Sequence, residues 1–306
     1  MNNLSGCLAA AAFLLLSCAA QKPSAPATSA PQADFPLAPA LTAGSTWANR
    51  VDVEQRAEQR IGGRGIETRL SFSTTYRFTL LGRGAGGELL MEAAYERLAI
   101  KAASPTGDWS FDSAASSAGA VGTARNGPRL DALRALVGGR FAFVLGTDMA
   151  VRDITGLPEL AARMAAAAGD PALASVAGSW MGEAPVRMGL EAIFGLFPRK
   201  KVAPGESWTL APAPVGGIPV TVRSRITATK VSGDTVSARV EGVIEPAGDR
   251  ADDGFRGTQT GAVELDTASL RITGGTMGQD IVGSVMVGGT KVPMTVSSTT
   301  RFESAE

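Results

Sequence analysis

Apolar and polar residues alternate over long stretches in the first third of the chain after its N-terminal segment. From residue 68 to residue 80 the side chains of one parity are Leu70, Phe72, Thr74, Tyr76, Phe78 and Leu80. A period of two over this length predicts a long, half-buried strand. Residues 46–61 alternate similarly, and the glycine-rich turn at 82–87 before the apolar residues 89–100 favours a hairpin. We expect this third to be antiparallel sheet.

The middle of the chain changes to helical spacing. Residues 130–137 carry apolar side chains at that spacing, and a compact hairpin is predicted at 140–155. Two further helices are predicted at 157–168 and 185–197, because a proline stands near each start and a glycine or proline follows each end. The helical segment therefore spans about residues 157–197.

Strand patterning returns after residue 202. Residues 220–229 and 236–244 flank a turn, and residues 257–302 predict a meander of at least three strands. We take this C-terminal part to be a second strand set.

The two strand sets begin alike. Gly44-Ser-Thr-Trp47 and Gly205-Glu-Ser-Trp208 share a Gly-x-x-Trp spacing ahead of a strand, a turn and a second strand. Glycine permits a tight turn into the strand, and Trp fits its first inward position. The sequence thus predicts a mainly β fold of the β-rich α+β kind. We expect a curved antiparallel sheet or half-barrel built from two weakly repeated strand sets, with a helical insertion in the middle.

The first residues have a different character. A short apolar run over residues 8–16 ends in Leu-Leu-Ser-Cys at Ser17 and Cys18. Export signals have an apolar core of about 7–15 residues, whereas a membrane span needs roughly 20. The run resembles the lipobox of bacterial lipoproteins, which implies a signal peptide at 1–17, cleavage between Ser17 and Cys18, and acylation of Cys18. The alternative is an ordinary secretory signal that is cleaved near Ala20.

Residues 21–40 are rich in Pro, Ala and Ser and lack apolar periodicity, which predicts a disordered tether. Extended as polyproline II, such a segment reaches roughly 60 Å. The alternative is an irregular strand of the domain. We therefore divide the chain into a signal peptide at 1–17, a lipidated cysteine with its tether at 18–40, and a single β-rich envelope domain at 41–306.

Composition excludes several kinds of site. The two cysteines, Cys7 and Cys18, both lie in the signal region, and the chain contains no histidine. Disulfides, thiolate metal clusters, common zinc sites and Ser-His or Cys-His catalysis are therefore excluded from the folded part. The chain has 29 basic and 29 acidic residues without a long block of one sign, so no nucleic-acid partner is indicated. We expect no metal and no cofactor.

The most specific motif is Leu-Phe-Pro-x-x-x-Val-x-x-Gly-x-x-Trp at residues 196–208. With the tether, the Gly-x-x-Trp strands and the glycine-rich meander, the chain resembles an uncharacterised family of bacterial envelope lipoproteins, a domain of unknown function, over about residues 41–303. That family lends no activity and no catalytic residue. In layout the chain is also similar to lipoprotein-carrier folds, in which helices close a curved sheet around an acyl-chain cavity.

The resemblance implies a protein that is anchored in the bacterial cell envelope through acylated Cys18. Ala19 rather than Asp follows this cysteine. Under the aspartate retention rule this favours the outer membrane, with the domain facing the periplasm.

The helical segment is the most apolar part of the domain. It either caps the open side of the sheet or lines an apolar pocket, for which the candidate residues are Met181, Met188, Phe194 and Tyr76. We favour non-catalytic binding of a lipid or another apolar ligand in the periplasm. One alternative is a structural or assembly protein that acts through an envelope protein partner.

A carboxylate-dependent hydrolase is the second alternative. Asp108 with Asp112, or Asp252 with Asp253, provides a pair of carboxylates. Both pairs stand in Ser-, Gly- and Ala-rich sequence that is typical of loops, so we assign no catalytic residue.

Overall fold

The computed structural model describes residues 41–105, 107–115, 127–169, 181–210, 213–214, 220–246, 254–287 and 289–305. The signal peptide at 1–17, the cleavage and lipidation residues Ser17 and Cys18, and the tether lie outside the described residues. The predictions made for them stay predictions.

Strands dominate the described part of the chain, and they form one 13-stranded antiparallel sheet. The strands of the first half are β1 (Thr46–Ile61), β2 (Arg64–Arg83), β3 (Leu89–Ala103), β4 (Trp109–Asp112), β5 (Arg140–Leu145) and β6 (Val151–Thr155). Those of the second half are β7 (Ser207–Thr209), β8 (Ala213–Pro214), β9 (Val220–Ser232), β10 (Thr235–Pro246), β11 (Arg256–Asp266), β12 (Arg271–Val287) and β13 (Thr290–Ala305). The described helices are α2 (Gly127–Leu136), α3 (Leu157–Ala168) and α5 (Glu183–Phe194). This confirms the mainly β fold that the alternation predicts.

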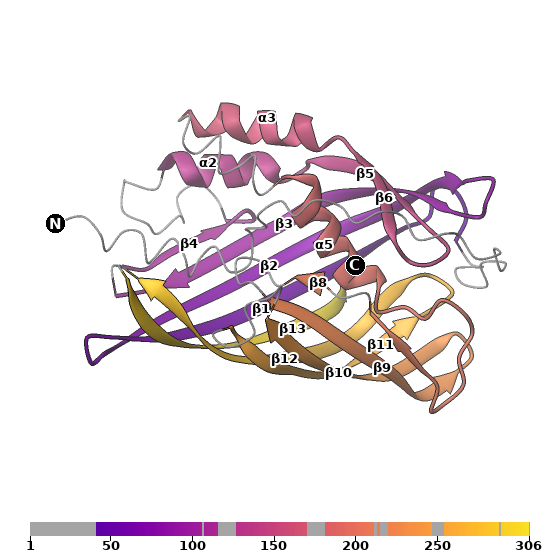
Figure 1. Cartoon of the computed structure of the whole chain (residues 1–306). Helices are drawn as coiled ribbons and strands as arrows, with labels where there is room; N and C mark the ends of the chain where they lie inside the picture. The colour runs from indigo at the N-terminus through magenta and orange to yellow at the C-terminus, as the bar shows by residue number, and fades with distance from the viewer. Residues whose placement is uncertain are drawn as a thin grey trace.

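The strand order runs β6-β5-β3-β2-β1-β13-β12-β11-β10-β9-β7, with β4 beside β3 and β8 beside β9. The first strand therefore pairs with the last, from Ala48 opposite Ala305 to Gln59 opposite Met294. We call this β1–β13 pairing the seam. The sheet is open, with β6 and β7 at its edges, and the chain between these edges contains α3 and α5 (Figure 1).

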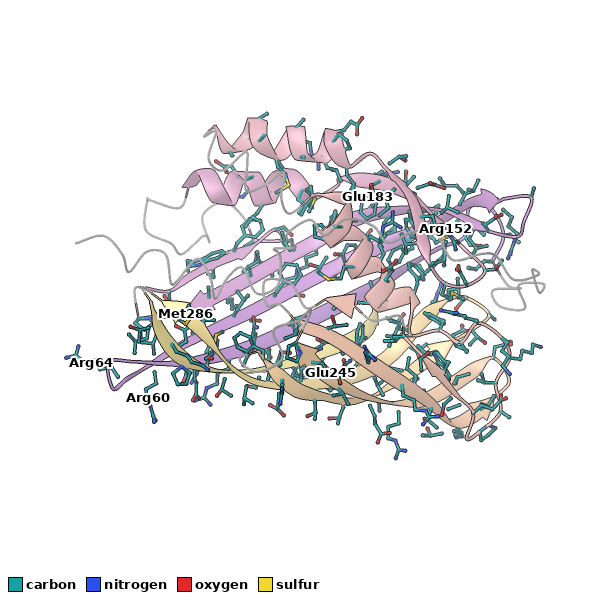
Figure 2. All side chains as sticks on the ribbon, in the orientation of Figure 1. Arg60, Arg64, Arg152, Glu183, Glu245 and Met286 are labelled. Carbon is teal, nitrogen blue, oxygen red and sulfur yellow. The ribbon has the colours of Figure 1, made fainter. Side chains whose placement is uncertain are left out.

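Alternation along each strand gives the sheet one buried and one exposed face. In β10, for example, Val236, Ala238, Val240 and Ile244 are buried, whereas Glu245 is exposed and points outward (Figure 2). The sheet curves so that its buried face is concave, and α5 lies across this concave side (Figure 1). Helices α2 and α3 contact each other, and α3 also contacts β5.

The two strand sets enter the sheet through the same turn. Gly44 donates its N–H to the Leu80 carbonyl at 2.7 Å, and Gly205 donates to the Ala228 carbonyl at 2.7 Å. Their φ angles are 87° and 88°, in the left-handed region that favours glycine. The repeat that the Gly-x-x-Trp spacing predicts is therefore present in the backbone.

The two tryptophans of the repeat differ in their surroundings. Trp208 donates its indole N–H to the Leu196 carbonyl at 3.2 Å, which fastens β7 to the end of the helical segment. Trp47 is buried against Phe78, with ring centroids 5.7 Å apart, and its indole N–H has no hydrogen-bond partner among the described residues. Both therefore serve packing at the start of a strand set.

The helical prediction is confirmed for α3 and shifted for α5. Helix α5 ends at Phe194 rather than at the predicted residue 197, because the N–H groups of Leu196 and Phe197 bond three residues back instead of four. It begins at Glu183, ahead of its proline. Residues 170–180 of the predicted helical segment lie outside the described residues.

The predicted C-terminal meander is present, and one loop prediction is wrong. Residues 257–302 form β11, β12 and β13, and β12 runs unbroken through its glycines. At Gly275 a Cβ would lie 2.9 Å from the Ala262 carbonyl oxygen, so glycine allows β11 and β12 to approach closely instead of breaking the strand. Asp112, expected in a loop, belongs to β4 because Phe111 packs into the core.

Candidate functional site

A cavity of about 440 Å³ lies between the concave face of the sheet and helices α2 and α5. This volume falls within the roughly 300–1,000 Å³ of small-molecule sites. The apolar lining from the sheet includes Val51, Val53, Phe72, Leu98, Ile100, Met277 and Phe302. The apolar lining from the helices and the segment after α5 includes Leu133, Leu136, Val186, Leu190, Ile193 and Phe197.

The apolar floor of the cavity is incompletely covered. Val51, Val53, Phe72 and Met277 point inward but are only half-buried. Inward positions of a sheet are normally sealed by the layer packed on them. These side chains face the cavity instead, which leaves apolar surface available to a ligand.

Three of the four pocket residues expected from the sequence line this cavity: Met181, Met188 and Tyr76. Phe194 is not part of the lining; it is 0% exposed, and its ring lies 5.2 Å from that of Phe78 in an edge-on contact. Helix α5 therefore does both things that the sequence left open. It caps the sheet through Phe194 and lines the pocket through Met188.

The two tyrosines of the chain, Tyr76 and Tyr95, both line the cavity and hydrogen-bond to each other through their side chains. Their rings are 5.0 Å apart. Burial raises the pKa of Tyr76 to about 12 and also raises the pKa of Tyr95 well above its ordinary value. Both hydroxyls are therefore neutral at physiological pH.

Charged residues also reach the cavity lining, namely Asp148, Glu191 and Arg199. Burial raises the pKa of Glu191, and nearby Asp148 adds to this effect. Burial also acts to raise the pKa of Asp148, but hydrogen bonds from Arg152 at 2.6 Å and from the Ala150 N–H outweigh it and lower that pKa. Asp148 is thus engaged in the turn between β5 and β6.

A row of polar side chains crosses the concave floor, which we call the polar row. Strand register places its members directly opposite one another on adjacent strands, from β1 through β13, β12 and β11 to β9, with glycine at the β10 position. In that order the members are Gln55, Ser298, Gln279, Gln259 and Ser224. Four of them line the cavity, and none is charged.

Gly242 of β10 completes the polar row without a side chain. Ser224 and Gln259 lie on either side of it, and the Ser224 hydroxyl donates to Gln259 Oε1 at 3.2 Å across the glycine. A Cβ at position 242 would lie 2.9 Å from the Ser224 Oγ. Glycine here lets two side chains from non-adjacent strands meet.

The polar row lies between two apolar clusters. The large cluster, on the side of α5, contains Val240 and Ile226 of the next row of the sheet. The small cluster, on the other side, contains Ala57, Val296 and Ile281. An uncharged polar band therefore crosses the floor between these two apolar clusters.

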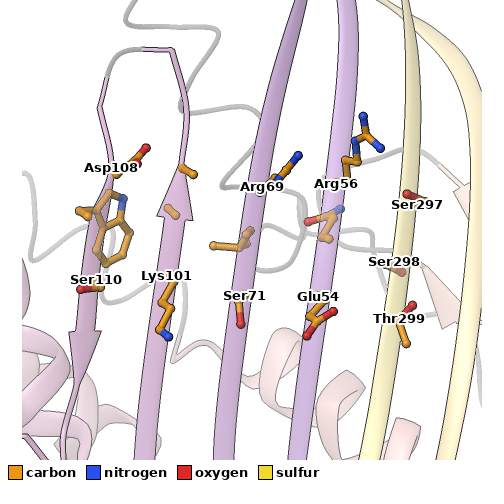
Figure 3. Close-up of a pocket in the computed structure, with 15 residues that line it drawn as sticks. Glu54, Arg56, Arg69, Ser71, Lys101, Asp108, Ser110, Ser297, Ser298 and Thr299 are labelled. Atoms are coloured by element: carbon orange, nitrogen blue, oxygen red, sulfur yellow. The ribbon is translucent and has the colours of Figure 1, made fainter.

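A second hollow of about 620 Å³ adjoins the cavity at the polar row, since Ser298 lines both. This groove crosses five adjacent strands, on which Figure 3 labels Ser110, Lys101, Ser71, Glu54 and Ser298 among others. Its inward residues include Gln55, Leu70 and Trp109. The groove thus continues the concave floor from the β1 end of the polar row across β2, β3 and β4.

Of the carboxylate pairs considered from the sequence, Asp108 and Asp112 lie within the described residues, and each accepts a hydrogen bond from a different group. Asp112 accepts a hydrogen bond from Arg97 at 2.8 Å, which lowers the pKa of this carboxyl. Asp108 accepts from the Ser104 N–H at 3.3 Å in a turn. Asp252 and Asp253 lie outside the described residues.

Two kinds of feature are absent from the described residues. These residues contain no group of three or more His, Cys, Asp or Glu side chains arranged to hold a metal ion. No helix among them has the length and apolar character needed to cross a membrane.

Comparison with known families decides the membership of the chain. The model of a family of unknown function, DUF6263, matches residues 86–270. The chain belongs to the DUF6263 family. The match includes the motif at residues 196–208 and confirms the expected kinship with an uncharacterised family, over a shorter range than residues 41–303. No curated protein matches the DUF6263 chain.

Solved structures give the fold a distant parallel. A structure of lipovitellin described as showing lipid–protein interactions has a TM-score of 0.51 at 8% identity, covering 87% of the DUF6263 chain and 25% of that chain. The DUF6263 chain thus spans a quarter of the lipovitellin chain, and the likeness concerns the fold. A DUF1329 family protein from Desulfovibrio piger has a TM-score of 0.14 at 10% identity, with 86% and 85% of the two chains covered.

Proposed function

We propose that this DUF6263 protein is a lipid-anchored envelope protein that binds an apolar ligand, namely an acyl lipid, without catalysis. The observation that carries the proposal is the cavity of about 440 Å³ with half-buried apolar residues on its floor. Such surface stays exposed to water until a ligand covers it, and covering it is favourable by about 25 cal/mol per Å². The lipid-binding lipovitellin fold is consistent with this use of a curved sheet.

The anchoring part of the proposal rests on the sequence. Cys18 ends the Leu-Leu-Ser-Cys run, and residues 21–40 supply a Pro-rich spacer before the domain. Multiple acyl chains on one cysteine hold a protein on a membrane far more firmly than a single chain does. We propose the outer membrane as the site of attachment, with the cavity in the periplasm.

The proposal of binding without catalysis rests on how the polar groups of the cavity are used. The members of the polar row are amides and hydroxyls, which do not titrate near neutral pH. Asp148 is held in its turn by Arg152, and Glu191 accepts a hydrogen bond from the Val151 N–H. Such groups suit orientation of a ligand more than proton transfer.

Native mass spectrometry of the full chain from an envelope fraction, before and after organic extraction, tests both parts of the proposal. A lipid-sized mass that extraction removes reports cavity binding. An acyl mass that survives extraction and disappears in Cys18→Ser reports the anchor. A wild-type chain free of extractable mass would refute the proposal of a bound lipid and would favour a role through protein partners.

A matched pair of variants assigns the extractable mass to the cavity. Val53 lines the cavity, so Val53→Trp fills part of it and is expected to remove the bound lipid. Val243 is 54% exposed on the outer face, so Val243→Trp is expected to retain it. Equal retention in both variants would place the lipid elsewhere.

A further inference from the structure

The polar row contains buried polar atoms that lack a suitable partner. Gln55 is 9% exposed, and its Oε1 has no hydrogen-bond partner among the described residues. Thr74, outside the polar row, also lines the cavity and is 0% exposed. Its Oγ1 likewise has no hydrogen-bond partner among the described residues. Buried polar groups in folded proteins are nearly always satisfied, so these orphan atoms call for an explanation.

Gln259 is satisfied only in part. Its Oε1 accepts from Ser224, but its amide nitrogen contacts the Met277 sulfur at 3.3 Å, and a thioether is a weak acceptor. Gln259 is 5% exposed, so bulk water does not replace the missing acceptor. The polar row therefore offers at least one unpaired acceptor, at Gln55, and one poorly paired donor, at Gln259.

The chemistry of the missing partner follows from the charge of the polar row. All five members are neutral, so a carboxylate or phosphate placed among them would lose its hydration without gaining a counter-charge. An ester carbonyl accepts from an amide N–H, and a hydroxyl donates to an amide oxygen. A neutral group that carries both an ester and a hydroxyl matches the unpaired atoms.

The position of the polar row fixes where such a group lies in a longer ligand. On one side the row borders the apolar cavity below α5, and at its β1 end it meets the groove, which Gln55 and Ser298 also line. An acyl chain in the cavity would bring its ester to the polar row and leave the more polar end in the groove.

We infer that the polar row binds the neutral ester and hydroxyl groups of an acylglycerol, whose acyl chain lies in the cavity. This inference rests on the proposed function and adds the chemical class of the ligand. It explains why polar residues are retained at inward positions, where apolar residues would pack the same floor without orphan atoms.

The test measures displacement of the apolar fluorophore N-phenyl-1-naphthylamine from the full chain. The competitors are monolauroylglycerol, laurate and dodecane, which share one carbon-chain length. Each hydrogen bond to an otherwise unpaired buried group is expected to be worth about tenfold in affinity. We expect monolauroylglycerol to displace the fluorophore at a concentration lower by at least about tenfold than either competitor.

Four variants test whether the preference for monolauroylglycerol arises at the polar row. Gln55→Leu and Gln259→Leu are each expected to weaken monolauroylglycerol binding about tenfold and to leave dodecane unchanged. Gln59→Leu is the matched control, because Gln59 is an inward residue of the same strand that lines neither hollow. Ser298→Ala makes a smaller change in the row, directly opposite Gln55, and serves if a leucine variant fails to fold.

The outcomes separate the inference from the proposed function. If neither the fluorophore nor any competitor binds the wild-type chain, the proposed function fails. If dodecane binds as well as monolauroylglycerol, or if Gln55→Leu and Gln59→Leu behave alike, the inference fails and the apolar cavity stands. Preferential binding of laurate would overturn the inference in favour of a charged headgroup.

Discussion

The tyrosine pair gives an optical test of how closed the cavity is. The chain contains two tyrosines, and both line the cavity, so the ultraviolet absorbance of tyrosinate reports this site alone. Burial raises the pKa of Tyr76 to about 12 from the ordinary 10.0, and it raises the pKa of Tyr95 as well. We expect the folded protein to show little tyrosinate at a pH where the urea-unfolded chain has titrated.

The same shift makes stability depend on pH in a definite direction. A buried acid whose folded pKa lies above its unfolded value contributes stability that is fully present below the unfolded pKa and is lost as pH rises through the folded pKa. For Tyr76 the window runs from pH 10.0 to about 12. The difference of about two units corresponds to at most about 3 kcal/mol of unfolding free energy.

The assay combines absorbance titration with circular dichroism at each pH, which shows whether the sheet is intact. Tyr76→Phe keeps the ring and removes one titrating hydroxyl, so the unfolding free energy should fall less steeply in this window. If both tyrosines titrate at their ordinary pKa while the sheet is intact, the hydroxyls face open solvent and the reasoning about their burial in the cavity is wrong.

Three further predictions concern single residues. Phe194→Ala should lower the unfolding free energy by about 3–5 kcal/mol in chemical denaturation, because Phe194 is fully buried among aromatic rings, whereas exposed Val243→Ala should change it by less than about 0.5 kcal/mol. Gly189→Ala in α5 should raise it by about 0.5–1 kcal/mol, because an added Cβ at this helical position has nothing within 4 Å. Cys18→Ser should abolish incorporation of radiolabelled palmitate into the protein, and Cys7→Ser should not; equal labelling of both variants would contradict acylation at Cys18.

The strands are predictable from sequence because alternation is a local signal. Residues 46–61 and 157–168 match β1 and α3 residue for residue. The unbroken β12 is not predictable in this way, since a glycine that ends a strand and a glycine that admits a neighbouring backbone look alike. Only the distance between β11 and β12 at Gly275 distinguishes the two cases.

The candidate site, too, is predictable from the sequence only in part. Apolar Met181 and Met188 stand out in the sequence, and they line the cavity. The polar row leaves only a faint trace, such as Gln55 between inward Val53 and Ala57. Nothing local shows that each such residue faces the next across a strand, because register is a property of the paired sheet.

The seam between β1 and β13 has a consequence for how the protein comes into being. Glu54 and Arg301 form a hydrogen bond across it although they are 247 positions apart, and the neighbouring Gln55 faces Ser298. At about 5–20 residues per second, synthesis of the 306 residues leaves β1 without its partner for on the order of 10–60 seconds. Chaperones that engage the growing chain therefore meet a protein whose concave floor is still in two pieces. The last strand to be made joins them.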